Sequence, residues 1–83
     1  RRQYDASTVR RVVFLTRMRV AGMSISDLQR YLALVAAGER TVHERLDLLM
    51  EHRDTLRAQI AQLQLSLAVT EYKIATYGGA TQP

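Results

Sequence analysis

Cysteine and tryptophan are absent from this 83-residue sequence, and proline and phenylalanine each occur once. Without cysteine, disulfides and thiolate metal sites are excluded, and the redox compartment cannot be inferred. The longest apolar run is residues 31–37, which is far too short to cross a bilayer. There is no signal-peptide pattern, and the opening string RRQYD, which has no methionine, leads us to expect a fragment. A chain this short forms at most one small domain, with little core unless it associates with another chain.

Acidic residues are nearly absent from the first 19 positions. That stretch holds six arginines and one aspartate, a net charge of +5, whereas residues 20–83 hold six basic and seven acidic residues, a net charge of −1. Such an asymmetry indicates contact with a polyanion. The plainer alternative is a solvated, arginine-rich helix face that has no partner.

What the sequence does contain is a heptad pattern that continues for five heptads up to Tyr77. Nine of the eleven positions on its seam are apolar, and so narrow a stripe is typical of a coiled coil, in which each seam residue packs against a second long helix. The seam consists of Val42, Leu46, Leu49, Arg53, Leu56, Ile60, Leu63, Leu67, Thr70, Ile74 and Tyr77. The pattern therefore predicts a dimerisation helix over residues 41–77, followed by a flexible tail over residues 78–83, and it predicts a homodimer.

Two polar residues on this seam predict the direction of pairing. In a parallel dimer Arg53 would face Arg53 of the partner, which buries two like charges. An antiparallel pair in which facing position numbers add up to 123 instead places Arg53 opposite Thr70, and it places apolar residues opposite one another elsewhere. The threonine hydroxyl can then accept a hydrogen bond from the guanidinium. We therefore expect an antiparallel coiled-coil homodimer centred between Ala61 and Gln62.

Capping residues and glycines predict two shorter helices ahead of the long one, over residues 6–21 and 25–37. The expected caps are Asp5 or Ser7, then Ser24, then Thr41 in a capping box with Glu44. The expected stops are Gly22, Gly38 and the pair Gly78 and Gly79. Buried faces are expected from Val9, Val12, Leu15 and Met18 in the first helix and from Ile25, Leu28, Leu32 and Val35 in the second. The fold class is all-α, apart from an edge strand considered at residues 1–4.

These residues carry a resemblance to a known family. Residues 1–34 read RRQYDASTVRRVVFLTRMRVAGMSISDLQRYLAL. They resemble the stretch of MerR-family transcription regulators that begins at the end of the first wing and continues through the next two helices. Members typically show an R-x-Y tail on the wing, here Arg2 to Tyr4, and an R-x-x-G-x-S turn, here Arg19 to Ser24. A long antiparallel dimerisation helix then follows, as it does here.

The resemblance implies that this chain is a C-terminal portion that lacks the N-terminal helix-turn-helix. Residues 1–5 would be a remnant of a DNA-binding wing, and residues 6–38 a two-helix second wing. Wing residues in the family mainly contact phosphates, which position a protein without reading sequence. The implied DNA-backbone contacts are Arg1, Arg2, Tyr4, Arg19 and Ser24. Arg10, Arg11 and Arg17 match no motif position and keep only the general electrostatic interpretation.

No cofactor or metal site is expected. Metal- and redox-sensing relatives use cysteines, and His43 and His52 are nine residues apart, on opposite sides of one helix, so solvated histidines are the better interpretation. The acidic residues Asp47, Glu51 and Asp54 lie off the seam with nothing opposite them, which favours a solvated face over an acid–base pair. An enzyme is therefore not expected, and the effector remains unknown.

Two function classes follow. The first is the dimerisation and wing portion of a MerR-like DNA-binding regulator, which is cytoplasmic, does not contact a membrane and binds promoter DNA through the full-length protein. The second is a coiled-coil protein–protein interaction module without a DNA-binding role. Leu65, Val69 and Tyr72 lie off the seam on a second apolar face, and either class would explain them. The basic N-terminal quarter and the resemblance favour the regulator.

Overall fold

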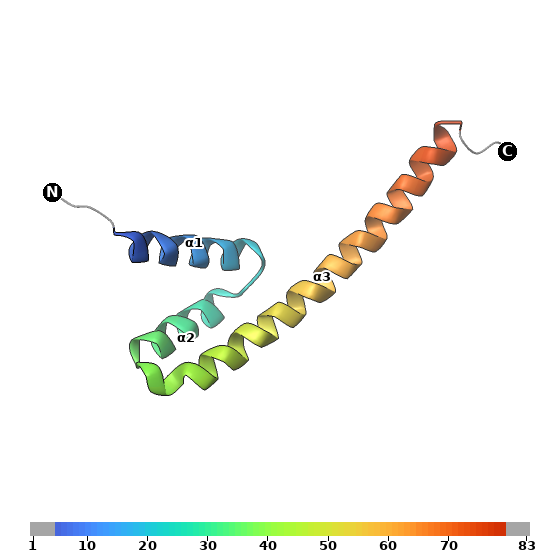
Figure 1. Cartoon of the computed structure of the whole chain (residues 1–83). Helices are drawn as coiled ribbons and strands as arrows, with labels where there is room; N and C mark the ends of the chain where they lie inside the picture. The colour runs from blue at the N-terminus through green and yellow to red at the C-terminus, as the bar shows by residue number, and fades with distance from the viewer. Residues whose placement is uncertain (1–4, 80–83) are drawn as a thin grey trace. The chain divides into compact units, whose positions relative to one another are not determined.

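The computed structural model describes residues 5–79. Over these residues it forms α1 (Ala6–Val20), α2 (Ile25–Ala36), the short 3₁₀ helix η1 (Glu39–Thr41) and α3 (Val42–Tyr77), as Figure 1 shows. The expected all-α fold is confirmed, and both short helices and the long helix lie within a residue or two of their predicted bounds. The edge strand considered at residues 1–4 lies outside the described residues.

The chain divides into two compact units, with the boundary between His52 and Arg53. We call them the N-terminal unit, described over residues 5–52, and the C-terminal unit, described over residues 53–79. The N-terminal unit holds α1, α2, η1 and the first turns of α3. The C-terminal unit holds the remainder of α3 and a short turn after it.

Helix α1 begins and ends on local signals. The Asp5 carboxylate accepts a hydrogen bond from the Thr8 amide at 2.9 Å, which satisfies an amide that has no partner within the helix. At the other end Gly22 adopts φ 104°, and the Met23 amide donates to the Met18 carbonyl at 3.0 Å. This is a Schellman motif, which glycine favours because it has no Cβ to clash in the left-handed region.

Helix α2 also begins as predicted, but α3 does not. The Ser24 hydroxyl accepts from the Asp27 amide at 3.0 Å and caps α2. The capping box expected at Thr41 is wrong, because Thr41 lies inside η1 and its hydroxyl donates to the carbonyls of Leu34 and Gly38, at 2.6 and 2.8 Å. Burial explains the difference: only 3% of Thr41 is exposed, so its hydroxyl bonds to the nearby end of α2.

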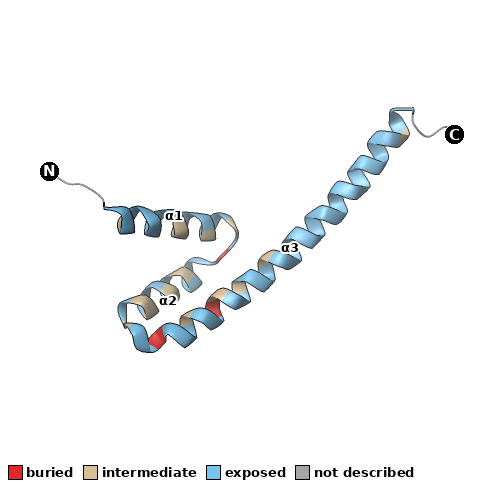
Figure 2. Cartoon of the chain, viewed as in Figure 1, coloured by how far each residue is buried: buried red, intermediate tan, exposed pale blue. Residues whose placement is uncertain are grey.

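The core of the N-terminal unit is small (Figure 2). Met23, in the turn after α1, and Leu48, on α3, are the buried apolar residues among those described, and each is 4% exposed. Around them the half-buried apolar side chains are Phe14, Leu15, Met18, Ala21, Leu28, Tyr31, Leu34, Val35 and Leu49. The Phe14 and Tyr31 rings join α1 to α2, with centroids 5.1 Å apart.

Several residues expected in the buried stripes are exposed instead. Val9 and Val12 on α1 and Ile25 at the start of α2 are 49%, 57% and 57% exposed. Half of the stripe predicted for α1 is correct, since Leu15 and Met18 are half-buried, and Phe14 beside them is half-buried as well. In the stripe predicted for α2, Leu32 is also exposed, at 36%. Amphipathicity alone does not say which half of a wide apolar face is covered.

Candidate nucleic-acid interface

Helix α1 is strongly basic along its whole length. It carries Arg10, Arg11, Arg17 and Arg19 and no acidic residue. Within the described part of the chain, the ion pair found is Arg53 with Asp54 in the C-terminal unit, so none of the α1 arginines is neutralised by a carboxylate. A helix with this charge attracts a polyanion at long range, and its guanidinium groups suit phosphate oxygens.

The turn between α1 and α2 places two of the expected DNA-backbone contacts near each other. The Arg19 guanidinium donates to the Met23 carbonyl at 3.4 Å, and Met23 directly precedes Ser24. Arg19 therefore braces the turn with one donor and retains the other donors of its guanidinium for an anion. Ser24 uses its hydroxyl oxygen to cap α2, and its O–H remains able to donate.

The remaining expected DNA-backbone contacts, Arg1, Arg2 and Tyr4, lie outside the described residues. Asp5 is the first described residue, and its carboxylate caps the basic helix α1. The hydrogen bond from the Thr8 amide, together with smaller contributions from the Thr8 and Ser7 side chains, holds the pKa of the Asp5 carboxyl below its ordinary value. Asp5 thus acts as a helix cap, and it is the sole carboxylate close to the α1 arginines in sequence.

The predicted pairing seam lies on α3 as a row of exposed side chains. Leu63, Leu67, Ile74 and Tyr77 are 69%, 56%, 64% and 80% exposed. Leu49 and Leu56 are half-buried, and the other seam residues, Val42, Leu46, Arg53, Ile60 and Thr70, are exposed. A second chain that would cover the seam is not part of the structure, so the homodimer and its direction stay predictions.

The two polar residues of the seam have local partners. Arg53 forms an ion pair with the neighbouring Asp54 at 3.0 Å, with both side chains well exposed. The Thr70 hydroxyl donates to the Ser66 carbonyl at 2.8 Å. Its oxygen can still accept a hydrogen bond, which the antiparallel pairing of Thr70 with Arg53 requires.

Sequence reasoning missed a polar junction where α2, η1 and α3 meet. The Arg45 Nε donates to the Thr41 hydroxyl and its Nη2 donates to the Gly38 carbonyl, both at 3.1 Å. Gly38, at φ 97°, makes the turn that brings these groups together. The available signal was the i, i+4 spacing of Thr41 and Arg45 directly after a glycine stop, but a capping box explained Thr41 as well.

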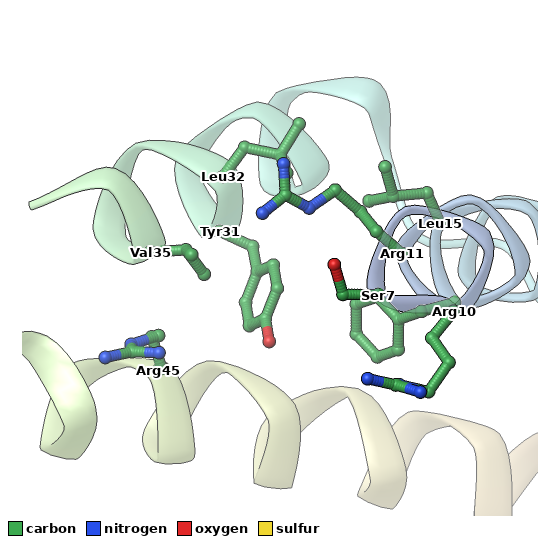
Figure 3. Close-up of a pocket in the computed structure, with 9 residues that line it drawn as sticks. Ser7, Arg10, Arg11, Leu15, Tyr31, Leu32, Val35 and Arg45 are labelled. Carbon is green, nitrogen blue, oxygen red and sulfur yellow. The ribbon is translucent and has the colours of Figure 1, made fainter. Parts of the chain in front are cut away.

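A cleft of about 280 Å³ opens in the N-terminal unit against α1 and α2 (Figure 3). Its apolar side is formed by the rings of Phe14 and Tyr31, which lie tilted against each other. Three arginines reach it, two from α1 and Arg45 from the start of α3. The full lining is Ser7, Arg10, Arg11, Phe14, Leu15, Tyr31, Leu32, Val35 and Arg45. Sequence analysis gave no reason to group these residues.

The histidines differ from each other. His43 is exposed, as expected, but His52 is half-buried, and its Nε2 is the buried side-chain nitrogen among the described residues that has no hydrogen-bond partner. The expectation that His52 is solvated is therefore wrong. It lies in the same unit as buried Leu48, one turn earlier on α3. Over the described residues no three histidine or acidic side chains gather as a metal site would require, and no helix is long and apolar enough to span a membrane.

Comparisons with known proteins agree on one family. A family model described as "MerR, DNA binding" matches residues 9–69. An uncharacterised HTH-type transcriptional regulator of Haemophilus influenzae is 38% identical over 56 residues, which are 68% of this chain and 42% of that protein. The HTH-type transcriptional regulator AdhR of Bacillus subtilis is 38% identical over 55 residues, which are 66% of this chain and 39% of that protein.

A solved structure supports the same assignment. The crystal structure of a Listeria monocytogenes protein assigned to the MerR family of transcriptional regulators matches with a TM-score of 0.86 and 37% identity, and covers 94% of this chain and 59% of that one. The chain thus spans about two fifths of the length of the curated relatives it matches.

The family match corrects one expectation. We expected a C-terminal portion without the DNA-binding helix-turn-helix, but the DNA-binding model lies on residues 9–69 of this chain. The fold offers a reason for the error. α1 and α2 are two short helices separated by residues 21–24, and such a pair fits more than one assignment when the sequence alone is considered. Sequence reasoning had assigned the same two helices to a second wing alone.

Proposed function

Because the chain belongs to the MerR family of DNA-binding transcriptional regulators, we propose that it contacts the backbone of promoter DNA through its N-terminal unit and pairs with a second copy through α3. In finer terms, residues 6–38 contact the duplex and residues 41–77 pair with the second copy. The wing remnant proposed at residues 1–5 and the tail proposed at residues 78–83 lie largely outside the described residues. A regulator that binds promoter DNA would act in the cytoplasm.

The observation that carries the DNA-binding part is the charge of α1. Four arginines without an acidic residue lie on one helix of the segment that the family's DNA-binding model matches. Contacts from arginine to phosphate release counterions, so they supply affinity that depends steeply on salt and little on sequence. We propose that Arg19 and Ser24, beside the turn, each contact a backbone phosphate.

Fluorescence anisotropy with a labelled duplex tests this proposal. We expect binding that weakens by at least tenfold between about 50 and 200 mM salt. Arg19→Ala should weaken binding to all sequences about equally and reduce the salt slope by about one. Arg57→Ala, which removes an exposed arginine of the C-terminal unit, is the matched control and should change little. Affinity that is independent of salt, or an equal loss in both variants, would contradict the proposal.

The pairing of α3 is supported by the exposed seam. In the proposed register Tyr77 faces Leu46, Ile74 faces Leu49 and Arg53 faces Thr70. Each Arg53 then finds a hydroxyl acceptor instead of a second arginine, and its ion pair with Asp54 shows that its guanidinium can reach the helix surface, away from the seam.

Cysteine crosslinking tests the direction. The two copies of Leu46 would lie about 45 Å apart in the antiparallel dimer, at ~1.5 Å per residue, so Leu46→Cys alone should not form an interchain disulfide. Leu46→Cys combined with Tyr77→Cys should crosslink, because facing residues approach within disulfide range. Rapid crosslinking of the single variant would show a parallel dimer and reject the proposed register.

The alternative function is a protein–protein interaction module. It would also account for a second row of exposed apolar residues on α3, namely Leu65, Val69 and Tyr72, which are 61%, 55% and 66% exposed. These residues call for a further contact, with a second copy or with another protein. The anisotropy experiment separates the two functions, since the alternative predicts no affinity for the duplex.

A further inference from the structure

We propose that the cleft of the N-terminal unit binds a small organic anion with a flat apolar body, such as an aromatic carboxylate. The binding itself is independent of the proposed function. Only the consequence argued below, that the bound anion weakens DNA binding, rests on it.

The shape of the cleft selects for a small ligand with a flat body. Its volume of about 280 Å³ lies just under the ~300–1,000 Å³ typical of drug-sized sites. The rings of Phe14 and Tyr31, 5.1 Å apart and inclined by 38°, form an aromatic wall. Leu15, Leu32 and Val35 extend the apolar surface. A ring placed here would leave water on one side and contact aromatic and aliphatic carbon on the other.

The charges of the cleft select for an anion. Arg10, Arg11 and Arg45 reach it, no acidic residue lines it, and none of the three forms an ion pair within the described chain. Arg45 is half-buried, and the acceptors it has are neutral, the Thr41 hydroxyl and the Gly38 carbonyl. These bonds leave three of its five N–H donors for a carboxylate, whose geometry matches a guanidinium. In Figure 3 Tyr31 lies between Arg45 on one side and Ser7 and Arg10 on the other.

A DNA phosphate explains the cleft less well. A phosphate contact uses hydrogen-bond donors and gains little from apolar carbon, whereas five of the side chains that line this cleft are apolar or aromatic. The other arginines of α1, Arg17 and Arg19, do not line it. Two arginines of α1, Arg10 and Arg11, therefore lie at a cleft with an apolar wall, whereas Arg17 and Arg19 lie outside it.

The shared helix suggests how the ligand would act. Arg10 and Arg11 contribute to the positive potential of α1, and a carboxylate bound between them would neutralise part of it. Loss of about one effective charge should weaken DNA binding by about threefold to tenfold at low salt. The bound ligand would thus weaken the affinity for DNA without a change of fold.

Titration of the 83-residue chain with 2-naphthoate, followed by NMR and calorimetry without DNA, tests the site. We expect a dissociation constant of order 0.1–1 mM, as is typical of so small a ligand. 2-Naphthalenemethanol, which has the same ring system and no charge, should bind at least about fivefold more weakly. Arg11→Gln should weaken naphthoate binding by about fivefold, whereas Arg17→Gln, on the same helix but outside the cleft, should leave it unchanged.

A second pair of variants guards against loss of folding. Ser7→Asp places a carboxylate in the cleft at the first turn of α1, where an acidic residue favours the helix, and should weaken naphthoate binding by about tenfold with the helix content unchanged. Ser7→Asn has the size of Ser7→Asp without its charge and should weaken naphthoate binding far less than Ser7→Asp does. Equal binding of naphthoate and the alcohol, equal loss in Arg11→Gln and Arg17→Gln, or no binding at all would overturn the proposed site.

The effect on DNA is measured separately by anisotropy with and without saturating naphthoate. A threefold to tenfold loss of affinity in the parent, absent in Ser7→Asp, supports the regulatory role. Naphthoate binding with an unchanged affinity for DNA would reject that role and leave the site standing. Naphthoate binding by a chain that does not bind DNA under any condition would reject the proposed function and leave the site standing.

Discussion

The N-terminal and C-terminal units contain similar proportions of apolar residues but differ in what those side chains contact. In the N-terminal unit Met23, Thr41 and Leu48 are buried, and α2 and η1 are joined by hydrogen bonds from Thr41 and Arg45. In the C-terminal unit Leu56 and Thr76 are half-buried, and every other described residue is exposed. The first unit has a small core of its own, whereas the apolar side chains of the second are exposed over almost all of its described residues.

This difference shows that one continuous helix can serve two purposes. The first turns of α3 contribute Leu48 to the core of the N-terminal unit, and the later turns display Leu63, Leu67 and Ile74 to solvent. An isolated helix gains little from propensity alone, so the later turns are expected to depend on association. We therefore expect substitutions in the C-terminal unit to act through dimerisation and substitutions in the N-terminal unit to act within one chain.

The largest expected effect is that of Leu63→Asp. It places a charge at the centre of the proposed seam and should cost about 3–5 kcal/mol for each substituted side chain in the dimer. Light scattering at micromolar concentration should then show a monomer of low helix content. Ala61→Asp, with the same charge on the outward face of the same turns, should remain dimeric. A well-folded monomer of the parent chain would show that the C-terminal unit does not depend on dimerisation.

Thr41→Val should have a smaller effect, confined to the N-terminal unit. It removes the hydroxyl that bonds to Leu34, Gly38 and Arg45 at a site that is 3% exposed. The loss of about 1–3 kcal/mol in the free energy of unfolding follows from the donor and acceptors left unsatisfied. Chemical denaturation measures it, and Thr55→Val, an exposed site in the C-terminal unit, is the matched control. Equal losses in both would mean that the polar junction contributes nothing.

His52→Leu should stabilise the chain slightly. The Nε2 atom of His52 is buried without a partner, and an apolar side chain of similar size removes that cost, so the gain should be up to about 1 kcal/mol. Thermal unfolding followed by circular dichroism would show a higher midpoint. His43→Leu, at an exposed position, should change stability by less than about 0.5 kcal/mol. A clear destabilisation by His52→Leu would indicate that the imidazole has a partner in solution.

The smallest expected effect is the pH dependence of the α1 cap. The pKa of Asp5 is lowered in the folded chain from its ordinary value of 3.8, chiefly by the Thr8 amide. The ionised cap therefore stabilises α1 above pH 3.8, and this stabilisation is lost as the pH falls through the lowered value. Asp5→Asn retains a capping oxygen and should remove this part of the acid transition seen by circular dichroism. An unchanged acid transition in that variant would show that the cap does not contribute.

Local signals predicted the helices well and their contacts less well. The caps at Asp5 and Ser24 and the stops at Gly22 and Gly38 lie where the sequence indicated, because capping depends on neighbours within three or four residues. Thr41 was misassigned because its hydroxyl had two possible uses, and the choice depended on Leu34, seven residues away.

The candidate sites divide in the same way. The basic helix was evident from composition, and Arg19 and Ser24 lie beside one turn as the motif indicated. The cleft was not predicted, because it requires the packing of Phe14 on Tyr31 and the return of Arg45 from the start of α3. The placement of the family's DNA-binding segment was also missed, since two short helices joined by a tight turn fit more than one assignment.

The sequence by itself determined the three main helices, most of their ends, the basic charge of α1 and the heptad seam with its two polar positions, because each follows from contacts or periodicities within a few residues along the chain. Tertiary structure decided which apolar residues are covered, where the hydroxyl of Thr41 bonds, that His52 lies half-buried and that three arginines meet an aromatic wall. These outcomes depend on the geometry of the turns at Gly22 and Gly38. Small differences in the backbone angles of those turns change which side chains come into contact, and local sequence patterns do not predict those angles closely enough.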